Sequence, residues 1–283
     1  MRTRPKTALL ESPIVLLGRH DPALPIALNA TETVLESQLA VVQDLWGPEN
    51  YSPLDEPFSS TALIAVPLTS GAIFGVVGSH LGARLRRYSE ETGIWIDAFE
   101  NNPPACRPQE RKGVKVKFHK WTDNGNQLAE NRFSLLFVFQ AGEMSGPLPS
   151  IYSRCAKGLR KGGQLFVADL MRPGAVLDGK ACSHKLRPPH DRCLRSLDDH
   201  KEALNAARLI VRKEYDLTEH VMAAIRHGLL GSTIMLTNVR KLENPWRIQR
   251  LSAFREQLET WLGLFQLLDL GVVSARGLLA SKP

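Results

Sequence analysis

The chain has 283 residues, of which 43% are hydrophobic and 23% are charged, and its formal net charge is +7. This balance is ordinary for a folded domain and excludes a disordered, fibrous or disulfide-framed protein. The length allows one large α/β domain with extra helices, or two small domains. The Lys and Arg residues are spread along the chain without an added RNA-binding module, so no nucleic-acid partner is predicted.

The cysteines and the N-terminus bear on the compartment. The four cysteines form no Cys-x-x-Cys pair, which is typical of reduced thiols in a cytosolic setting; they are Cys106, Cys155, Cys182 and Cys193. Residues Met1–His20 are basic but lack the apolar core and cleavage site of a secretory signal, whereas an organelle transit peptide stays open. No apolar run reaches the roughly twenty residues of a membrane helix. A cytoplasmic protein is therefore predicted.

The first part of the chain is predicted to be helical after an irregular start. Residues 1–29 are rich in proline and are predicted to be an irregular segment. Apolar residues then recur at helical spacing, which predicts a helix over Ala30–Trp46 that ends at Gly47-Pro48. The segment Trp46–Pro53 is predicted to be a loop. Residues 30–283 are taken as one domain.

From residue 72 onwards, short apolar runs alternate with helical patterns. Strands are predicted over Ala72–Val77, Ile94–Phe99, Val114–Phe118, Phe133–Phe139, Gln164–Asp169, Leu209–Tyr215 and Val272–Ser281. Helices are predicted over Leu81–Tyr88, Leu148–Leu159, His200–Ala207, Thr218–Gly228 and Asn244–Leu268. In the first of these helices, Leu85 is predicted to face inward and Arg86 outward. This alternation indicates an α/β fold with a parallel sheet and crossover helices.

The turn after the first strand is the natural ligand site of such a sheet. Ligands bind at the carboxyl ends of parallel strands, and the N–H groups at the start of the next helix point into the crevice. Here the turn runs from Gly75 to Gly82. The second strand ends at Glu100, whose carboxylate is suited to accept hydrogen bonds from two ribose hydroxyls.

An ordered series of segments resembles class I S-adenosylmethionine-dependent methyltransferases. Ile73–Pro103 is similar to the first two motifs of that family, Phe133–Glu143 to its fourth strand and loop, and Leu159–Leu170 to its Gly-Gly turn and fifth strand. Leu197–Thr218 and Gly271–Pro283 are similar to its later elements. The resemblance implies a Rossmann-like, doubly wound, mostly parallel seven-stranded sheet with an antiparallel last strand. It also implies an N-terminal helical lid over residues 30–70, on the substrate side.

The resemblance implies S-adenosylmethionine as cofactor and transfer of its methyl group to a small molecule of the quinone, amine or lipid-precursor type. The residues that it places at the cofactor are Gly78, Ser79, His80, Gly82, Glu100, Trp121 and Gln140. Trp46 and Tyr51 are candidates for walls of the substrate pocket, with packing of the N-terminal helix as the alternative. Glu143 and Asp169 are the candidate catalytic carboxylates, with helix capping as the alternative.

Two positions depart from the family pattern. Val76 stands where the family has an acidic residue, and His80 stands where it has the middle glycine of the first loop. The His80 side chain would fill the cofactor crevice, bind another ligand, or point into solvent. The departures keep open a second hypothesis, that the protein is an inactive methyltransferase-like binding, scaffold or complex subunit.

Two further features have less specific patterns. Cys182, His184, His190 and Cys193 are zinc-type ligand residues, but they lack the usual long gap between ligand pairs, so no metal is predicted. A polar loop near the substrate side is the preferred interpretation. The apolar helix Asn244–Leu268 is predicted to be core or lid, with a homodimer face as the alternative.

Overall fold

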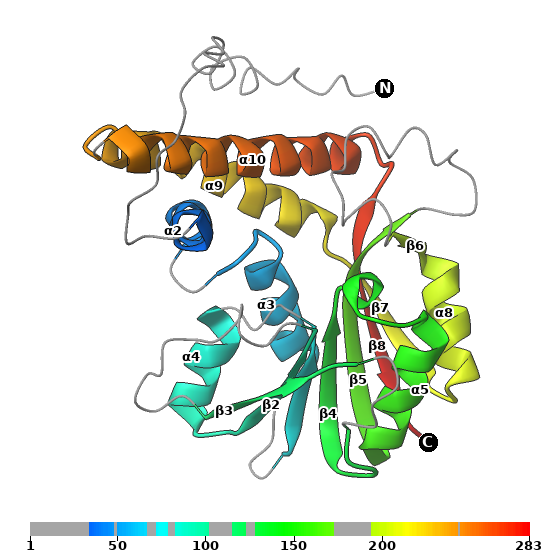
Figure 1. The fold of residues 1–283 in the computed structure, drawn as a ribbon. Coiled ribbons are helices and arrows are strands. Elements are labelled where there is room, and N and C mark those ends of the chain that lie inside the picture. Colours follow the sequence, from blue (N-terminus) through cyan, green and yellow to red (C-terminus); the bar gives the residue numbers. More distant parts are fainter. Residues whose placement is uncertain are drawn as a thin grey trace. The chain divides into compact units, whose positions relative to one another are not determined.

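The computed structural model describes residues 34–47, 50–66, 72–78, 83–101, 115–122, 128–172, 194–242 and 244–283. Residues Val34–Pro283 form one compact unit, in which helices cover both faces of a twisted sheet (Figure 1). The predicted domain boundary between residues 29 and 30 lies outside the described residues.

The sheet has the strand order β3-β2-β1-β4-β5-β8-β7, and a two-residue strand, β6, pairs with β5 beside this path. All pairs are parallel except the two that β8 makes with β5 and β7. The strands are β1 (Phe74–Val77), β2 (Ile96–Glu100), β3 (Val116–Lys120), β4 (Phe133–Phe139), β5 (Leu159–Arg172), β6 (Arg195–Ser196), β7 (Ile210–Asp216) and β8 (Ser274–Ser281). The predicted doubly wound, mostly parallel sheet with an antiparallel last strand is confirmed, and β6 is an addition to the seven predicted strands.

Apolar side chains on both sides of the central strands explain why the sheet is covered on both faces. In β1, Phe74 and Val76 point to one face, where they join an apolar cluster with α3, α9 and α10. Val77 points to the other face, into a cluster with α5 and α8. Near-continuous apolar strands of this kind are typical of a parallel sheet buried between two helical layers.

The helices are α2 (Val34–Trp46), α3 (Asp55–Ala65), α4 (Ala83–Thr92), α5 (Leu148–Gly158), α8 (Leu197–Ala206), α9 (Thr218–Val239) and α10 (Asn244–Asp269). A short 3₁₀ turn, η2, covers Ala141–Glu143. The start of α8 is set by a capping box. The Ser196 hydroxyl accepts a hydrogen bond from the Asp199 N–H, and the Asp199 carboxylate accepts one from the Ser196 N–H. Helix α8 therefore begins three residues before the predicted start.

The predicted end of the helix at Gly228 is wrong, because α9 continues to Val239. Gly228 lies inside the helix, where the ring of Trp46 from α2 packs directly on it. A Cβ atom at Gly228 would lie 2.1 Å from that ring and 2.8 Å from the Leu45 carbonyl oxygen. The glycine therefore serves a helix–helix contact, which a single sequence cannot distinguish from a helix stop.

Other differences are smaller. Helix α3 was not delimited by any sequence pattern, and β5 begins five residues earlier than predicted because Leu159 already pairs with Phe133. The pairing of β4 with β5 then shifts in register, from Phe133–Leu159 to Leu135–Gln164, and the residues of β5 skipped by this shift include the Gly-Gly pair. The orientation predicted for Arg86 is wrong, since its side chain is buried and 3% exposed.

Three helices lie beyond the carboxyl ends of the parallel strands, which face the top of Figure 1. Helices α2, α9 and α10 share an apolar cluster that includes Leu45, Met235 and Phe254. We call these three helices the cap. No helix among the described residues is long and apolar enough to span a bilayer.

Candidate functional site

The order of the strands points to the carboxyl ends of β1 and β4 as the place for a ligand. At this point the sheet order reverses, because β2 and β3 extend to one side of β1 and β4 and β5 to the other. Ligands of doubly wound folds bind at such a reversal, beyond the carboxyl ends of the strands. Gly78, Glu100 and Gln140 lie at the ends of β1, β2 and β4, and the strand register brings Asp169 of β5 beside Gln140 at the same edge.

Gly78 is forced to be glycine by its neighbours. Its φ angle is +107°, its N–H donates to the Phe99 carbonyl at 3.0 Å, and a Cβ atom would lie 2.1 Å from the Phe139 carbonyl oxygen. Gly78 is thus wedged between the ends of β2 and β4, and this packing requires glycine independently of any ligand. Val76, two residues earlier, is fully buried in the apolar cluster and offers no polar atom.

Glu100 is buried at the end of β2, with 1% of its surface exposed. The Glu100 carbonyl accepts a hydrogen bond from the Trp121 N–H at 2.6 Å. The adjacent Asn101 accepts one from the Ser145 N–H at 3.3 Å, so the end of β2 is tied to the loop after β4. This arrangement fixes the backbone that carries the carboxylate.

Trp121 is a core residue with defined partners. Its ring is 1% exposed, its Nε1–H donates to the Ser145 carbonyl at 3.1 Å, and the Arg154 guanidinium lies 3.5 Å from the ring centroid. Stacking of a cation on one face of the ring contributes to holding α5 against the end of β3. Contact of Trp121 with an adenine ring stays a prediction.

Gln140 ends β4 in an unusual conformation. Its φ angle is +48°, in the left-handed region that costs a non-glycine residue about 1 kcal/mol. The Gln140 N–H donates to the Ala168 carbonyl at 2.9 Å, and the side chain is buried. Backbone strain of this kind is concentrated at ligand sites, which fits the placement of Gln140 on the edge.

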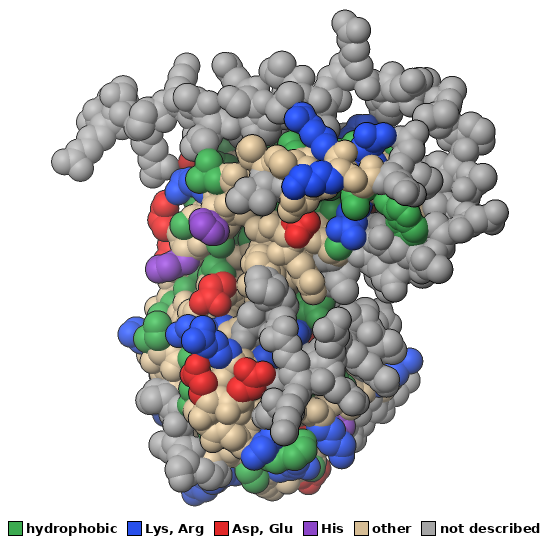
Figure 2. Space-filling model, turned by 90° about the vertical axis from the view of Figure 1, so that its left-hand side faces the viewer, with side chains coloured by type: hydrophobic (Ala, Val, Ile, Leu, Met, Phe, Trp, Pro, Cys, Tyr) green, Lys and Arg blue, Asp and Glu red, His purple; other side chains and the backbone are tan. Residues whose placement is uncertain are grey.

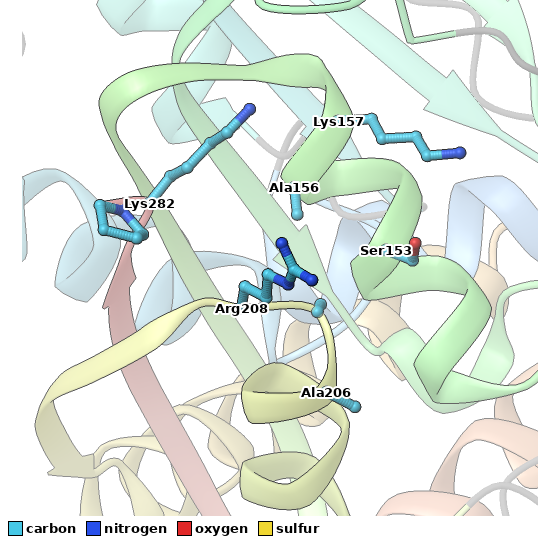
Figure 3. A pocket seen from close by; sticks show the side chains of 8 residues that line it. Ser153, Ala156, Lys157, Ala206, Arg208 and Lys282 are labelled. Carbon is cyan, nitrogen blue, oxygen red and sulfur yellow. The ribbon is translucent and has the colours of Figure 1, made fainter.

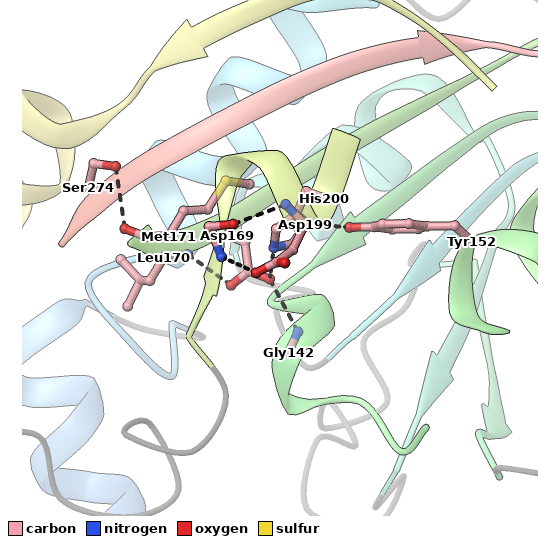
Figure 4. Close-up of polar contacts among 9 residues, drawn as sticks. Gly142, Tyr152, Asp169, Leu170, Met171, Asp199, His200 and Ser274 are labelled. Carbon is pink, nitrogen blue, oxygen red and sulfur yellow. Dashed lines mark hydrogen bonds and ion pairs between the residues drawn. The ribbon is translucent and has the colours of Figure 1, made fainter. Parts of the chain in front are cut away.

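Asp169, three residues before the end of β5, connects four segments (Figure 4). Its carboxylate accepts hydrogen bonds from the Leu170 N–H at 2.8 Å and from the Gly142 N–H at 3.2 Å. Behind it, His200 Nε2 lies 3.7 Å from Asp169 Oδ2, and the Tyr152 hydroxyl lies 2.6 Å from His200 Nδ1. Side chains from β5, α8 and α5 thus meet at the loop after β4.

Burial keeps the two aromatic members of this group neutral. Removal from solvent lowers the pKa of His200 to about 4; the nearby Asp199 charge acts in the opposite direction and the Arg195 charge in the same direction as burial. Removal from solvent also raises the pKa of Tyr152 well above its usual value, and the Asp169 charge adds to this effect. At neutral pH the imidazole and the phenol are therefore both uncharged.

A second polar group lies where α3 begins. The Asp55 carboxylate is fully buried and accepts hydrogen bonds from the Tyr51 N–H at 2.7 Å and the Ser52 hydroxyl at 2.8 Å. The buried Arg86 of α4 donates to the Tyr51 hydroxyl at 3.3 Å. Tyr51 is thus held between Asp55 at the start of α3 and Arg86 of α4. Its contact with a substrate stays a prediction.

Trp46 makes its described contacts within the helices of the cap. Its ring packs on Gly228, lies edge-on to Trp261 with 5.7 Å between centroids, and its Nε1 is 3.5 Å from Gln257 Oε1. These contacts agree with the alternative of helix packing, and a role in the substrate pocket stays a prediction.

Several predicted residues cannot be placed. Ser79, His80, Gly82, Cys182, His184, His190 and Cys193 lie outside the described residues, as does the side chain of Glu143. Within the described ranges, no group of His, Cys, Asp and Glu is arranged to hold a metal ion.

The sequence reasoning missed Asp55, Arg86, Tyr152 and His200. For Asp55 a signal was present, since Ser52-x-x-Asp55 has the spacing of a capping motif. For His200 the signal was its place among the inward positions of α8, beside Ala203 and Leu204. Arg86 has no such signal, because the pattern of its helix favours an outward side chain.

A basic pocket lies at the opposite edge of the sheet (Figure 3). It has a volume of about 390 Å³ and is lined by residues that include Lys157, Arg208 and Lys282. Helices α5 and α8 both end there, and their carbonyl ends disfavour an anion. On the face shown in Figure 2, described Lys and Arg side chains are interspersed with Asp and Glu and form no continuous basic patch.

Comparison with known proteins gives the class of the fold. No protein-family model matches the chain, and no curated protein matches it by sequence. Solved structures match its fold. One is phosphoethanolamine N-methyltransferase 2 of Haemonchus contortus, bound to phosphomonomethylethanolamine and S-adenosylhomocysteine; it has a TM-score of 0.71 and 14% identity over 90% of this chain and 59% of that chain. The present chain therefore spans less than two thirds of that enzyme.

Two further structures match most of both chains. The cyclopropane synthase MmaA2 of Mycobacterium tuberculosis has a TM-score of 0.63 and 12% identity, over 79% of this chain and 82% of that chain. Geranyl diphosphate methyltransferase in complex with S-adenosylmethionine has a TM-score of 0.59 and 12% identity, over 91% and 94%. The protein has the fold of class I S-adenosylmethionine-dependent methyltransferases.

Proposed function

We propose that the protein binds S-adenosylmethionine at the ends of β1, β2 and β4 and transfers its methyl group to a small molecule. The observation that carries this proposal is the buried Glu100 carboxylate beside the Gly78 turn, at the reversal of the strand order. The matched structures support the choice of cofactor, since two of them contain S-adenosylmethionine or S-adenosylhomocysteine.

The described residues fit the ribose part of this cofactor. The Glu100 carboxylate would accept hydrogen bonds from the ribose hydroxyls. The space beside Gly78 is filled by the Phe139 carbonyl, so Gly78 sets the path of the chain next to this carboxylate. Val76 faces the apolar cluster, so it cannot hold the amino group of the methionine part. That group would have to be bound by other residues of the edge.

The chain contributes orientation and exclusion of water. When bound, the cofactor supplies a methyl group made electrophilic by its sulfonium sulfur. The protein then needs to hold the acceptor in line with that methyl group and keep water out. The cap covers the strand ends, and the Asp169 carboxylate would bind an N–H or O–H group of the acceptor. Carboxylates on this edge favour an acceptor that brings a hydrogen-bond donor, such as an amine.

Isothermal titration calorimetry with S-adenosylmethionine and S-adenosylhomocysteine tests the proposal. We expect dissociation constants in the micromolar range, which correspond to a binding free energy of about −8 kcal/mol. Glu100→Gln should weaken binding by roughly tenfold or more, because a hydrogen bond to a charged group contributes about 1.5–3 kcal/mol. The control is Glu130→Gln, a change at an exposed glutamate just before β4, which should bind as the unchanged protein does. Absence of heat at millimolar ligand would refute cofactor binding.

The second candidate is an inactive methyltransferase-like binding or scaffold protein. It is favoured by Val76, which stands where the family has an acidic residue and whose apolar surroundings would offer a carboxylate no hydrogen-bonding partner. The two candidates differ in turnover. If the protein binds S-adenosylmethionine but leaves it unconverted with a panel of amines, quinones and lipid precursors, the inactive form is supported.

A further inference from the structure

Tyr152, His200 and Asp169 form a buried group with more polar contacts than Asp169 would need merely to bind the backbone N–H groups beside it. Asp169 already accepts hydrogen bonds from two backbone N–H groups. His200 and Tyr152 lie behind it, fully buried, on two helices that pack on the same face of the sheet. Burying an imidazole and a phenol is costly unless their polar atoms are paired, so their arrangement needs a physical reason.

The contacts favour one position for the proton of the neutral His200 imidazole. Among the described residues, the Tyr152 hydroxyl has one hydrogen-bonding partner, His200 Nδ1 at 2.6 Å. If the phenol donates, Nδ1 accepts and the proton of the neutral ring is on Nε2, which faces Asp169 Oδ2 at 3.7 Å. The other tautomer would leave the phenol proton unpaired and direct the Nε2 lone pair at a carboxylate. The first arrangement is therefore favoured.

The Nε2–H group thus presents its positive end to the Asp169 carboxylate. At 3.7 Å the contact is too long for a hydrogen bond, so it acts as an electrostatic contact in a site of low dielectric constant. The same Oδ2 atom accepts the Gly142 N–H in the loop after β4. This loop also contains Gln140 in its left-handed conformation.

We propose that Tyr152 and His200 are positioning residues that orient the Asp169 carboxylate and, through it, the Gln140–Met144 loop of the candidate site. In this respect they resemble the partners that fix the tautomer of a functional histidine, except that here the histidine serves the carboxylate. The proposal rests on the proposed function only in its final step, from the loop to the ligand.

The first test uses the protein without ligand. In Tyr152→Phe, His200 Nδ1 loses its donor, so the ring is no longer held with Nε2–H towards Asp169. We expect the amide of Gly142 to exchange with solvent about fivefold faster, the effect of losing roughly one hydrogen bond, as measured by NMR. Amides inside β4 and β5 should keep their exchange rates. A fold that is merely loosened would instead show faster exchange across α5, α8 and the strands, which would overturn the proposal.

The tautomer provides a spectroscopic signature. In the unchanged protein, the ¹⁵N shifts of the His200 ring should identify Nδ1 as the unprotonated acceptor and Nε2 as the protonated nitrogen. A protonated Nδ1 would overturn the proposal. The control is Tyr215→Phe, which removes a hydroxyl from β7 and should alter neither the His200 signals nor the exchange of Gly142.

The second test is calorimetry with S-adenosylhomocysteine, at a temperature where near-ultraviolet circular dichroism shows every variant to be folded. Tyr152→Phe should weaken binding about fivefold, and this loss should largely disappear in an Asp169→Asn background, because the effect passes through the carboxylate. Equal losses in both backgrounds, or none in either, would overturn the proposal. If the unchanged protein does not bind the ligand, the proposed function fails, and Gly142 exchange alone decides whether the positioning role stands.

Discussion

Acid should destabilise this protein through His200 in a narrow and calculable pH window. Burial lowers the pKa of His200 from 6.5 to about 4. Between these values the unfolded chain binds a proton that the folded chain does not, so the free energy of unfolding falls as the pH falls. Above pH 6.5 both states are neutral at this residue, and below about 4 both are protonated, so the effect is confined to the interval between the two pKa values.

The magnitude follows from the shift in pKa. Each unit of difference contributes about 1.36 kcal/mol, so the whole window of about 2.5 units amounts to about 3 kcal/mol. Between about pH 7 and pH 5 the loss is about 2 kcal/mol, since only the part below 6.5 counts. The imidazole is fully buried, so screening by solvent reduces this value little.

Urea unfolding at several pH values measures the effect. The His200→Gln variant has no group at this position that titrates in this range. Between about pH 7 and pH 5, its free energy of unfolding should therefore fall by about 2 kcal/mol less than that of the unchanged protein. His220→Gln, a change at an exposed histidine on α9, should reproduce the pH dependence of the unchanged protein. If the curves for His200→Gln and the unchanged protein run parallel between about pH 7 and pH 5, the assignment of a low pKa to a buried, neutral His200 is wrong.

Two glycine pairs give further predictions. Gly78→Ala should cost several kcal/mol or prevent folding, because its Cβ atom would lie 2.1 Å from the Phe139 carbonyl oxygen, whereas Gly271→Ala, at φ +69° with open space around it, should cost only about 1 kcal/mol in chemical denaturation. Gly228→Ala should lower the melting temperature by displacing Trp46. Gly231→Ala, on the same helix with nothing within 4 Å, should raise it, because alanine favours a helix by about 1 kcal/mol over glycine. Equal effects within either pair would refute the packing argument.

The alternation of apolar strands and helices was sufficient to predict an α/β fold with a parallel sheet and crossover helices, and the resemblance to class I methyltransferases added the doubly wound arrangement. The bounds of β4 were predicted without error, because Phe133–Phe139 is a continuous apolar run buried on both faces. Predictions failed where one residue type serves two purposes. Gly228 was interpreted as a helix stop, but a Trp ring from a distant helix occupies the space above it.

The candidate site was predictable only in part. Glu100 and Asp169 were found because residues at strand ends are brought to one edge by the parallel topology. Arg86 was placed on the wrong face, since the pattern of α4 does not reveal that Tyr51 covers it. Placement on the edge does not test a ligand role, which stays a prediction for each of these residues.

The sequence by itself determined the fold class, because hydrophobic periodicity and turn residues are local properties of the chain. It also determined the edge of the sheet at which to look for a site, since parallel strands share a direction. Only the tertiary structure decided that Gly78 is wedged between two neighbouring strands, and that Tyr152 and His200 meet Asp169 from separate helices. Such contacts depend on distances between residues far apart in the chain, and no local pattern encodes them.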